Sequence, residues 1–267
     1  MGVTIYRNIN VGDVPPTPST PDIDEGITTE SVRSLLQFGS ILGHPISYIQ
    51  EQGGRLIQNL VPVKKTEDQQ ISTSSKVNLE IHTETSFHPY RPSHVLLLCL
   101  RGDENAVTTY ADDFDIVEKL DEDTIKTLQQ NWFTTQIDDS FRTHGEENME
   151  MVCPILSRNP KRKDIWKITY DSFFMKARGV DEESHAAAEN ALSKFRNAVD
   201  ESTKEIVLKT GDLLVINNEC TVHGRKPFSA RYDGTDRWVQ RMLVIDRLPP
   251  LSQRDGNVIT TRFGKKK

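Results

Sequence analysis

His82 and Glu84 stand two positions apart in LEIHTET, a run whose apolar and β-branched residues predict a buried strand. Side chains at positions i and i+2 of a strand project from the same face, so both groups should point the same way. An ionised carboxylate on an inward face costs free energy unless something compensates its charge. The pair therefore predicts either a face open to water or a bound cation.

A His-x-Glu pair by itself is weak support for a metal site. With seven histidines and 39 acidic residues in the chain, about one such pair is expected by chance. The chain contains two, and the second, His144-x-Glu146, lies in the polar run RTHGEENMEM, which has no strand pattern. We interpret the second pair as part of a solvated loop.

The third ligand of a metal site at His82 and Glu84 is expected to be His223. The run LLVI predicts a strand, and His223 follows it after a turn at Asn217-Asn218. The order His-x-Glu then His is that of the two-histidine, one-carboxylate triad of non-haem iron(II) oxygenases, which leaves open positions for a co-substrate and dioxygen. The competing interpretation is a buried structural histidine beside a surface acid.

Arg237 and Arg241 lie four positions apart in RWVQRMLVID, which predicts a strand with Arg237, Val239 and Arg241 on one face. Two cations on an inward face are costly unless carboxylates meet them. A dicarboxylate such as 2-oxoglutarate is a suitable partner, because its keto-acid end can chelate iron while its far carboxylate meets an arginine bidentately. The competing interpretation is a pair of surface arginines on an edge strand.

Composition excludes several classes of partner. A net charge of −6 argues against broad binding to nucleic acids or anionic membranes. The longest apolar run, residues 95–100, is far shorter than a membrane span, and the first ten residues have no apolar signal core. Three widely spaced cysteines, an odd number, fit reduced thiols better than a disulfide framework. We therefore expect a cytoplasmic protein that binds a small molecule, with its oligomeric state left open.

Strand patterns on both sides of a helical segment must position these side chains. Residues 11–26 are rich in Pro, Ser and Thr, which predicts an extended segment there, and residues 1–26 are assigned to an N-terminal arm. Helices are predicted at 28–38, 121–133 and 181–199, and a polar loop at 64–76. Strands are predicted after Gly53-Gly54, around His82, and in the runs at 95–100, 106–114, 205–218 and 237–246. Without an internal repeat, this order predicts one mainly β domain with helices over residues 1–267, interrupted by a helical insertion at about 112–205.

These runs make the chain resemble the clavaminate synthase-like iron(II)/2-oxoglutarate oxygenases, particularly the branch that hydroxylates free basic amino acids. The resemblance extends from about Leu42 to Ile245 and is densest in EQGGRLIQNLVPV, ISTSSKVNLEIHTETSFHPYRPSHVLLLCLR, DDSF and DGTDRWVQRMLV. It implies a double-stranded β-helix (jelly-roll) core with a helical insertion and a lid. It also implies an amino-acid hydroxylase that uses Fe(II), 2-oxoglutarate and O2.

The resemblance also implies roles for individual residues. His82, Glu84 and His223 would bind iron, and Arg237 with Thr109 would hold the far carboxylate of 2-oxoglutarate. The amino-acid substrate would contact Arg241, Glu84, Gln52 (with Gln50 as the alternative), Asp138, Ser140 and Asp171, and the last three would grip its cationic end.

Two positions bear on the reaction and the substrate. Radical halogenases of this superfamily have Gly or Ala where Glu84 stands, so hydroxylation is the expected outcome, with desaturation or ring closure as alternatives. Phe173 replaces a second acid that the arginine users carry, which leaves lysine, ornithine or a related cationic amino acid open beside arginine. Two other functions compete, namely an oxygenase for amino acids tethered to a carrier protein and a non-catalytic jelly-roll binding protein.

Overall fold

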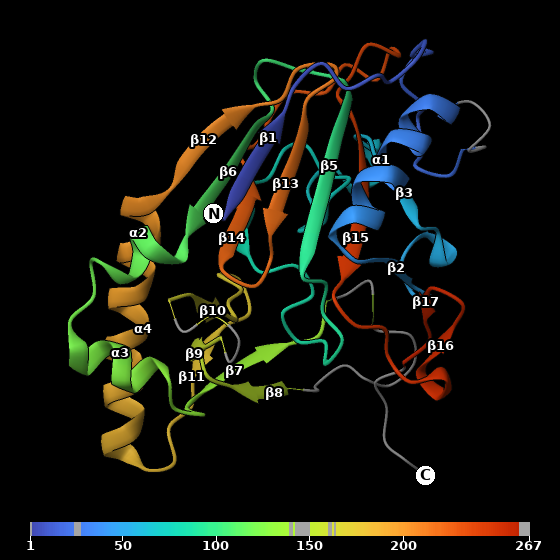
Figure 1. Cartoon of the computed structure of the whole chain (residues 1–267). Coiled ribbons are helices and arrows are strands. Elements are labelled where there is room, and N and C mark those ends of the chain that lie inside the picture. Colours follow the sequence, from blue (N-terminus) through green and yellow to red (C-terminus); the bar gives the residue numbers. More distant parts are fainter. Residues whose placement is uncertain are drawn as a thin grey trace.

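Two facing sheets build the core of the protein (Figure 1). The computed structural model describes residues 2–23, 28–138, 141, 150–159, 162 and 164–261. The larger sheet has eight strands in the order β1-β13-β5-β15-β2-β17-β16, with β3 also paired to β15. Only its β2–β17 pair is parallel among the described strands. The strands are β1 (Val3–Tyr6), β2 (His44–Tyr48), β3 (Ile57–Leu60), β5 (His94–Arg101), β13 (Leu213–Asn217), β15 (Trp238–Ile245), β16 (Arg254–Asp255) and β17 (Val258–Ile259).

The smaller sheet carries the histidines and is antiparallel throughout. Its order is β12-β6-β14-β4. One apolar cluster, which includes Leu97, Leu214, Val239 and Leu243 from the larger sheet, fills the space between the two sheets. The strands of the smaller sheet are β4 (Leu79–His82), β6 (Val107–Asp112), β12 (Lys204–Val207) and β14 (Thr221–Arg225).

Strand β15 shows how alternation separates the two faces of the larger sheet. Every residue of β15 is buried, because the second sheet covers one face and helix α1 (Thr29–Leu42) covers the other. Val239 and Leu243 belong to the cluster between the sheets, whereas Trp238 and Met242 pack on the α1 side. Arg241 therefore points inward with Val239, as the sequence predicts.

The smaller sheet is covered on its outer face by the segment between β6 and β12. Ala111 and Val222 of this face pack with Phe195 and other residues of helix α4 in a second apolar cluster. Helix α4 starts at a capping box, in which Asp181 accepts from the Ser184 amide. The helices of this segment are α2 (Asp113–Val117), α3 (Glu122–Leu128) and α4 (Glu182–Ser202).

Several short strands accompany these helices and were not predicted. Two small sheets, β9-β10 and β11-β7-β8, join segments that the sequence patterns left unassigned, except that the predicted helix at 121–133 included Phe133, the first residue of β7. Runs of two to four residues are too short to show a period of two. These strands are β7 (Phe133–Gln136), β8 (Glu150–Cys153), β9 (Leu156–Arg158), β10 (Trp166–Ile168) and β11 (Lys176–Ala177).

The N-terminal arm begins with a short strand. Residues 3–6 form β1 at the edge of the larger sheet, paired with β13. The extended part that follows is fastened by Arg101, whose guanidinium donates to the carbonyl oxygens of Val14 and Pro15 at 3.3 and 3.0 Å. None of the described helices is both long and apolar enough to span a bilayer.

Candidate metal centre and its cavity

The smaller sheet brings the two predicted histidine ligands face to face. His82 ends β4 and is the register partner of His223 on β14, so the antiparallel pairing places the two rings side by side, with centroids 4.6 Å apart. With Glu84 they offer three ligand atoms that all lie within 4.8 Å of one another. The Nε2 atom of His223 lies 3.6 Å from a carboxylate oxygen of Glu84.

Glu84 reaches the histidines from a turn, so the prediction of one strand carrying both His82 and Glu84 is wrong. Strand β4 ends at His82, and Thr85 has a left-handed backbone with φ of 48°. Asn218, which is fully buried, holds this turn in place: its side chain accepts from the Glu84 amide at 2.8 Å and donates to the Glu84 carbonyl oxygen at 3.1 Å. The two-residue spacing therefore brings the ligands together through a turn that Asn218 fixes.

The protonation of the cluster suits a divalent metal. The Nδ1 atom of His82 lies 2.7 Å from the Glu80 carbonyl oxygen, which can only accept, so Nδ1 carries the proton and Nε2 presents its lone pair. Burial lowers the pKa of His223, and Glu84 acts in the opposite direction. Burial would raise the pKa of Glu84, but Arg241 and the two histidines hold it below its usual range. Neutral imidazoles and an ionised carboxylate form the donor set of a mononuclear iron(II) site.

Arg241 is tied into a network at the edge of the cluster. Its guanidinium donates to Glu84 at 2.8 Å, to Glu51 at 2.9 Å and to the side-chain oxygen of Gln58 at 2.8 Å. The sequence patterns identified Arg241 but not Glu51 or Gln58. Glu51 lies in a polar turn, where no periodic pattern indicates which way a side chain points.

A cavity of about 750 Å³ opens over the cluster. Most of the predicted site residues line it, as do side chains that were not predicted, including Asp68, Thr108 and Arg225. Ser140 lies outside the described residues, as do His144 and Glu146. The predicted residues in its wall are His82, Glu84, His223, Arg237, Arg241, Gln50, Gln52 and Asp138.

One end of this cavity is cationic. Arg237 is 7% exposed, and among the described residues its guanidinium has no hydrogen-bond acceptor and no carboxylate within 4.0 Å. Arg225 lies in the same wall, and burial together with the charge of Arg237 lowers its pKa to about 9. The buried hydroxyl of Thr108 likewise has no partner in the described part of the chain. This end of the cavity is built to receive an anion.

Thr109 lies on the other face of strand β6. It pairs with Gly224, whereas Thr108 pairs with Arg225, which lines the cavity. A Cβ atom added to Gly224 would lie 3.1 Å from the Thr109 hydroxyl, so this hydroxyl packs over Gly224. Because side chains alternate along a strand, the cavity-facing threonine is Thr108, one position from the predicted residue.

Asp171, Gln50 and Gln52, which were predicted to contact the substrate, all form hydrogen bonds with the backbone. One oxygen of Asp171 accepts from the amides of Phe173 and Phe174, both at 2.9 Å, which is a turn-capping arrangement. Asp171 does not line the cavity, although its backbone bridges to His82. Gln52 exchanges two bonds of 3.3 Å with the backbone of Asn59. These side chains hold local structure around the cavity.

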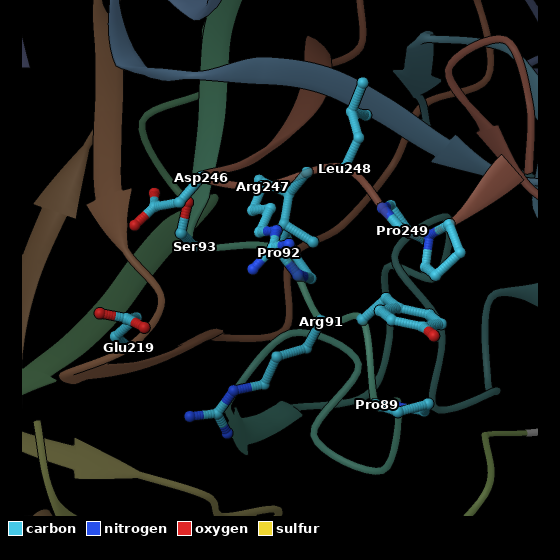
Figure 2. A pocket seen from close by; sticks show the side chains of 12 residues that line it. Pro89, Arg91, Pro92, Ser93, Glu219, Asp246, Arg247, Leu248 and Pro249 are labelled. Atoms are coloured by element: carbon cyan, nitrogen blue, oxygen red, sulfur yellow. The ribbon is translucent and has the colours of Figure 1, made fainter. Parts of the chain in front are cut away.

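Figure 2 shows a second cavity, of about 710 Å³, between residues 89–93 and 245–250. Arg91 in its wall donates to the Thr169 hydroxyl at 2.8 Å, and Glu219 accepts from Lys167. Among the described residues, the two cavities share no lining side chain, and none of the three candidate ligands lies in the second one. The chemistry is therefore assigned to the cavity over the cluster.

Comparison with known proteins agrees with this geometry. The family model described as taurine catabolism dioxygenase TauD, TfdA family, matches residues 25–243. Enduracididine beta-hydroxylase of Streptomyces hygroscopicus is 33% identical over 241 residues, which cover 82% of this chain and 69% of that protein. L-lysine 3-hydroxylase of Catenulispora acidiphila is 32% identical over 260 residues, which cover 95% of this chain and 70% of that protein.

Solved structures show the same architecture. A point mutant of the non-heme iron oxygenase OrfP, in complex with (3S)-hydroxy-L-Arg, superposes with a TM-score of 0.86 at 28% identity, covering 97% of this chain and 81% of that one. Asparagine oxygenase in complex with Fe(II), a 3-hydroxyasparagine and succinate gives a TM-score of 0.83 at 30% identity, covering 97% and 80%. The predicted jelly-roll fold and the predicted resemblance are both confirmed. The chain belongs to the TauD/TfdA family of dioxygenases.

Proposed function

We propose that this protein is an Fe(II)- and 2-oxoglutarate-dependent hydroxylase of a free L-amino acid with a cationic side chain. The observation that carries the proposal is one cavity that holds both a His-Glu-His cluster and, in its wall, a buried Arg237 with no carboxylate partner in the described part of the chain. The experiment that tests it follows succinate and hydroxylated product together when free amino acids are supplied.

The relatives support this reaction. OrfP has been solved with Fe and alpha-ketoglutaric acid, and asparagine oxygenase with Fe(II) and succinate. Relatives named as hydroxylases of lysine, of ornithine and arginine, and of enduracididine all match more than three quarters of the chain. When bound, iron(II) and 2-oxoglutarate would supply the oxidation: 2-oxoglutarate and O2 give succinate and carbon dioxide, with one oxygen atom of O2 entering succinate and the other a substrate C–H bond.

The chain's own residues would bind and orient the reactants. His82, Glu84 and His223 would hold the metal on one side and leave the cavity side open. Arg237 would meet the far carboxylate of 2-oxoglutarate, and the Thr108 hydroxyl would donate to it in place of the predicted Thr109. Holding both reactants in the cavity supplies the proximity and exclusion of water on which such oxidations depend.

The network at Arg241 is suited to the head group of an amino acid. A zwitterion carries one carboxylate and one ammonium. These groups are complementary in charge to Arg241 and Glu51, which pair with each other in this structure. We propose that the substrate carboxylate pairs with Arg241 while Glu51, together with Glu84, takes the ammonium. Gln58 donates to Glu51 and accepts from Arg241, so it orients both partners.

Of the two acids predicted to read a cationic side chain, Asp138 is the better placed. It lines the cavity at the end of the described segment 28–138, whereas Asp171 is occupied by the turn at Phe173. Phe173, 58% exposed, lines the same wall and would cover the stem of a long side chain. Ser140, which was predicted beside Asp138, remains a proposed contact from the resemblance alone.

Asp138→Asn should therefore lower the preference for cationic over neutral substrates. Loss of one charge-assisted contact of about 1.5–3 kcal/mol predicts a roughly 10- to 150-fold loss of selectivity. Substrate-dependent succinate formation with lysine, arginine and ornithine against norleucine and citrulline measures it. Asp171→Asn is the matched control, because it removes the charge of a carboxylate that caps a turn outside the cavity. It should lower the stability of the protein more than its selectivity for cationic substrates. If Asp171→Asn alone changes the selectivity, the acids have been assigned in reverse.

Two alternatives remain open to the same assay. An amino acid tethered to a carrier protein would trigger succinate formation when the free amino acid does not. A non-catalytic binding protein would form no succinate with either. The completeness of the cluster and the uncompensated charge of Arg237 favour the enzyme over the binding protein.

We also propose a cytoplasmic location and a single domain. All three cysteines are unpaired, which fits a reducing compartment. The proposed domain covers residues 1–267, with an N-terminal segment at 1–26 and the insertion at about 112–205 covering the smaller sheet. Its proposed partner is a small-molecule substrate, with no nucleic acid or membrane.

A further inference from the structure

Arg225 is a second buried guanidinium in the wall of the site cavity. It follows His223 by two positions on β14, so both side chains lie on the same face of the strand. It is 4% exposed and lines the cavity together with Arg237 and Thr108. The roles proposed above account for Arg237 but not for Arg225.

The hydrogen bonds of Arg225 leave its charge uncompensated. It donates to the carbonyl oxygen of Ser74 at 2.6 Å, to the Ser74 hydroxyl at 3.0 Å and to the Val77 carbonyl oxygen at 3.5 Å. Its guanidinium carbon lies 4.9 Å from the centre of the Phe228 ring. All of these partners are neutral, and its Nε atom is buried without a partner among the described residues.

Two such cations in one wall are costly to bury without an anion. In the described part of the chain neither Arg225 nor Arg237 has a carboxylate within 4.0 Å. The acids Glu51 and Glu84 of the same cavity are paired with Arg241. Asp68 and Asp138 also line the cavity, but neither carboxylate lies within 4.0 Å of these two guanidinium groups, so both positive charges at the end proposed for the far carboxylate of 2-oxoglutarate stay unpaired in the described part of the chain.

Arg225 also fastens a loop beside the cavity. Ser74 directly follows residues 68–73, which line the cavity, and the neighbouring Ser75 carbonyl oxygen accepts from the Phe228 amide at 2.8 Å. A guanidinium has five donors in a fixed fork, so one side chain can hold a loop backbone and still present charge to a ligand. A lysine at this position could supply the charge but not the same set of bonds.

We propose that Arg225 is a positioning residue for 2-oxoglutarate: it supplies a second positive charge to the site of the far carboxylate and fixes the loop at Ser74 that closes that end of the cavity. The inference rests on the proposed function. It predicts that binding of the dicarboxylate depends on Arg225 and that binding of a keto acid without the far carboxylate does not.

The experiment measures binding to the full chain loaded with Fe(II) under anaerobic conditions, by calorimetry and without amino acid. Arg225→Met should weaken 2-oxoglutarate binding by roughly 10- to 100-fold, and Arg225→Lys should weaken it less because the charge remains. Binding of 2-oxopentanoate, which lacks the far carboxylate, should be the same in wild type and in Arg225→Met. Amide exchange over residues 68–76 should rise in both variants.

Arg101→Met is the matched control, because Arg101 also fastens a segment through backbone carbonyl oxygens but does not line the cavity. It should leave 2-oxoglutarate binding at the wild-type level. If Arg225→Met binds 2-oxoglutarate as tightly as wild type, or loses both keto acids equally, the inference is overturned. An effect of Arg101→Met as large as that of Arg225→Met would overturn it as well. Failure of wild type itself to bind 2-oxoglutarate would instead contradict the proposed function.

Discussion

His223→Ala is expected to abolish iron binding at the cluster and, with it, substrate-dependent succinate formation. His223 supplies one of three ligands, and its Nε2 atom lies 3.6 Å from Glu84, so its loss leaves two donors and an exposed cavity side. Removing a residue that only hydrogen-bonds to a metal ligand typically lowers metal affinity by roughly 10- to 100-fold, and removing the ligand itself should lower it further. Anaerobic titration with Fe(II) and 2-oxoglutarate, followed by the visible charge-transfer band of the iron–keto-acid complex, measures it.

His94→Ala provides the comparison for this variant. His94 begins β5, lies outside the site cavity and contacts the Ser93 hydroxyl at 3.1 Å. It should bind one Fe(II) per chain and show the same band as wild type. If His223→Ala kept the band, the cluster would not be the metal site.

Arg237→Ala is expected to raise the KM for 2-oxoglutarate by roughly 30- to 1,000-fold, which corresponds to about 2–4 kcal/mol for a charge-assisted pair in a closed site. Iron binding should change little, because Arg237 contacts none of the three ligands in the described structure. Initial rates at varied 2-oxoglutarate, with saturating amino acid, give the KM.

The variant Arg241→Ala distinguishes the proposed role of Arg241 from that of Arg237. It should raise the KM for the amino acid, because Arg241 pairs with Glu51 and Glu84 at the other end of the cavity. If instead Arg237→Ala lost amino-acid affinity and kept its 2-oxoglutarate KM, the two assignments would be reversed.

Residue types and spacing predicted much of the site, because side chains alternate between the two faces of a strand. The number of positions between two residues therefore indicates whether they share a face. Alternation predicts that Arg237 and Arg241 lie on the same face of the strand as the apolar Val239. Because an apolar side chain should face the core, the two arginines were also expected to point inward. The same rule, applied to His223, would have indicated Arg225, which lies two positions further on the same strand. The signal was present in VHGRKPF.

The failures have physical causes as well. Both Thr108 and Thr109 are buried, at 3% and 6% exposure, because layers cover both faces of β6, so no polar–apolar alternation marks the inner one. A slip of one position then exchanges the faces. Glu84 depends on the left-handed turn at Thr85 and on Asn218, a residue 134 positions away in sequence, which no local pattern can indicate.

The pairing of His82 with His223 could not be predicted from local sequence patterns. His82 and His223 become neighbours only because β4 and β14 pair in the smaller sheet, and strand pairing across so long a separation is set by topology. The triad could be proposed from its order and from the resemblance. The distances between its three side chains could be known only once the fold had placed the two strands side by side.

The central claim is tested most directly by incubating the Fe(II)-loaded protein with 2-oxoglutarate, O2 and each free amino acid in turn, while succinate and the amino-acid product are quantified together. We predict that lysine, arginine or ornithine triggers succinate formation and yields an equal amount of product carrying one added oxygen atom, whereas norleucine and citrulline respond weakly. Succinate formation that no free amino acid increases, or that norleucine increases as much as lysine, would contradict the account.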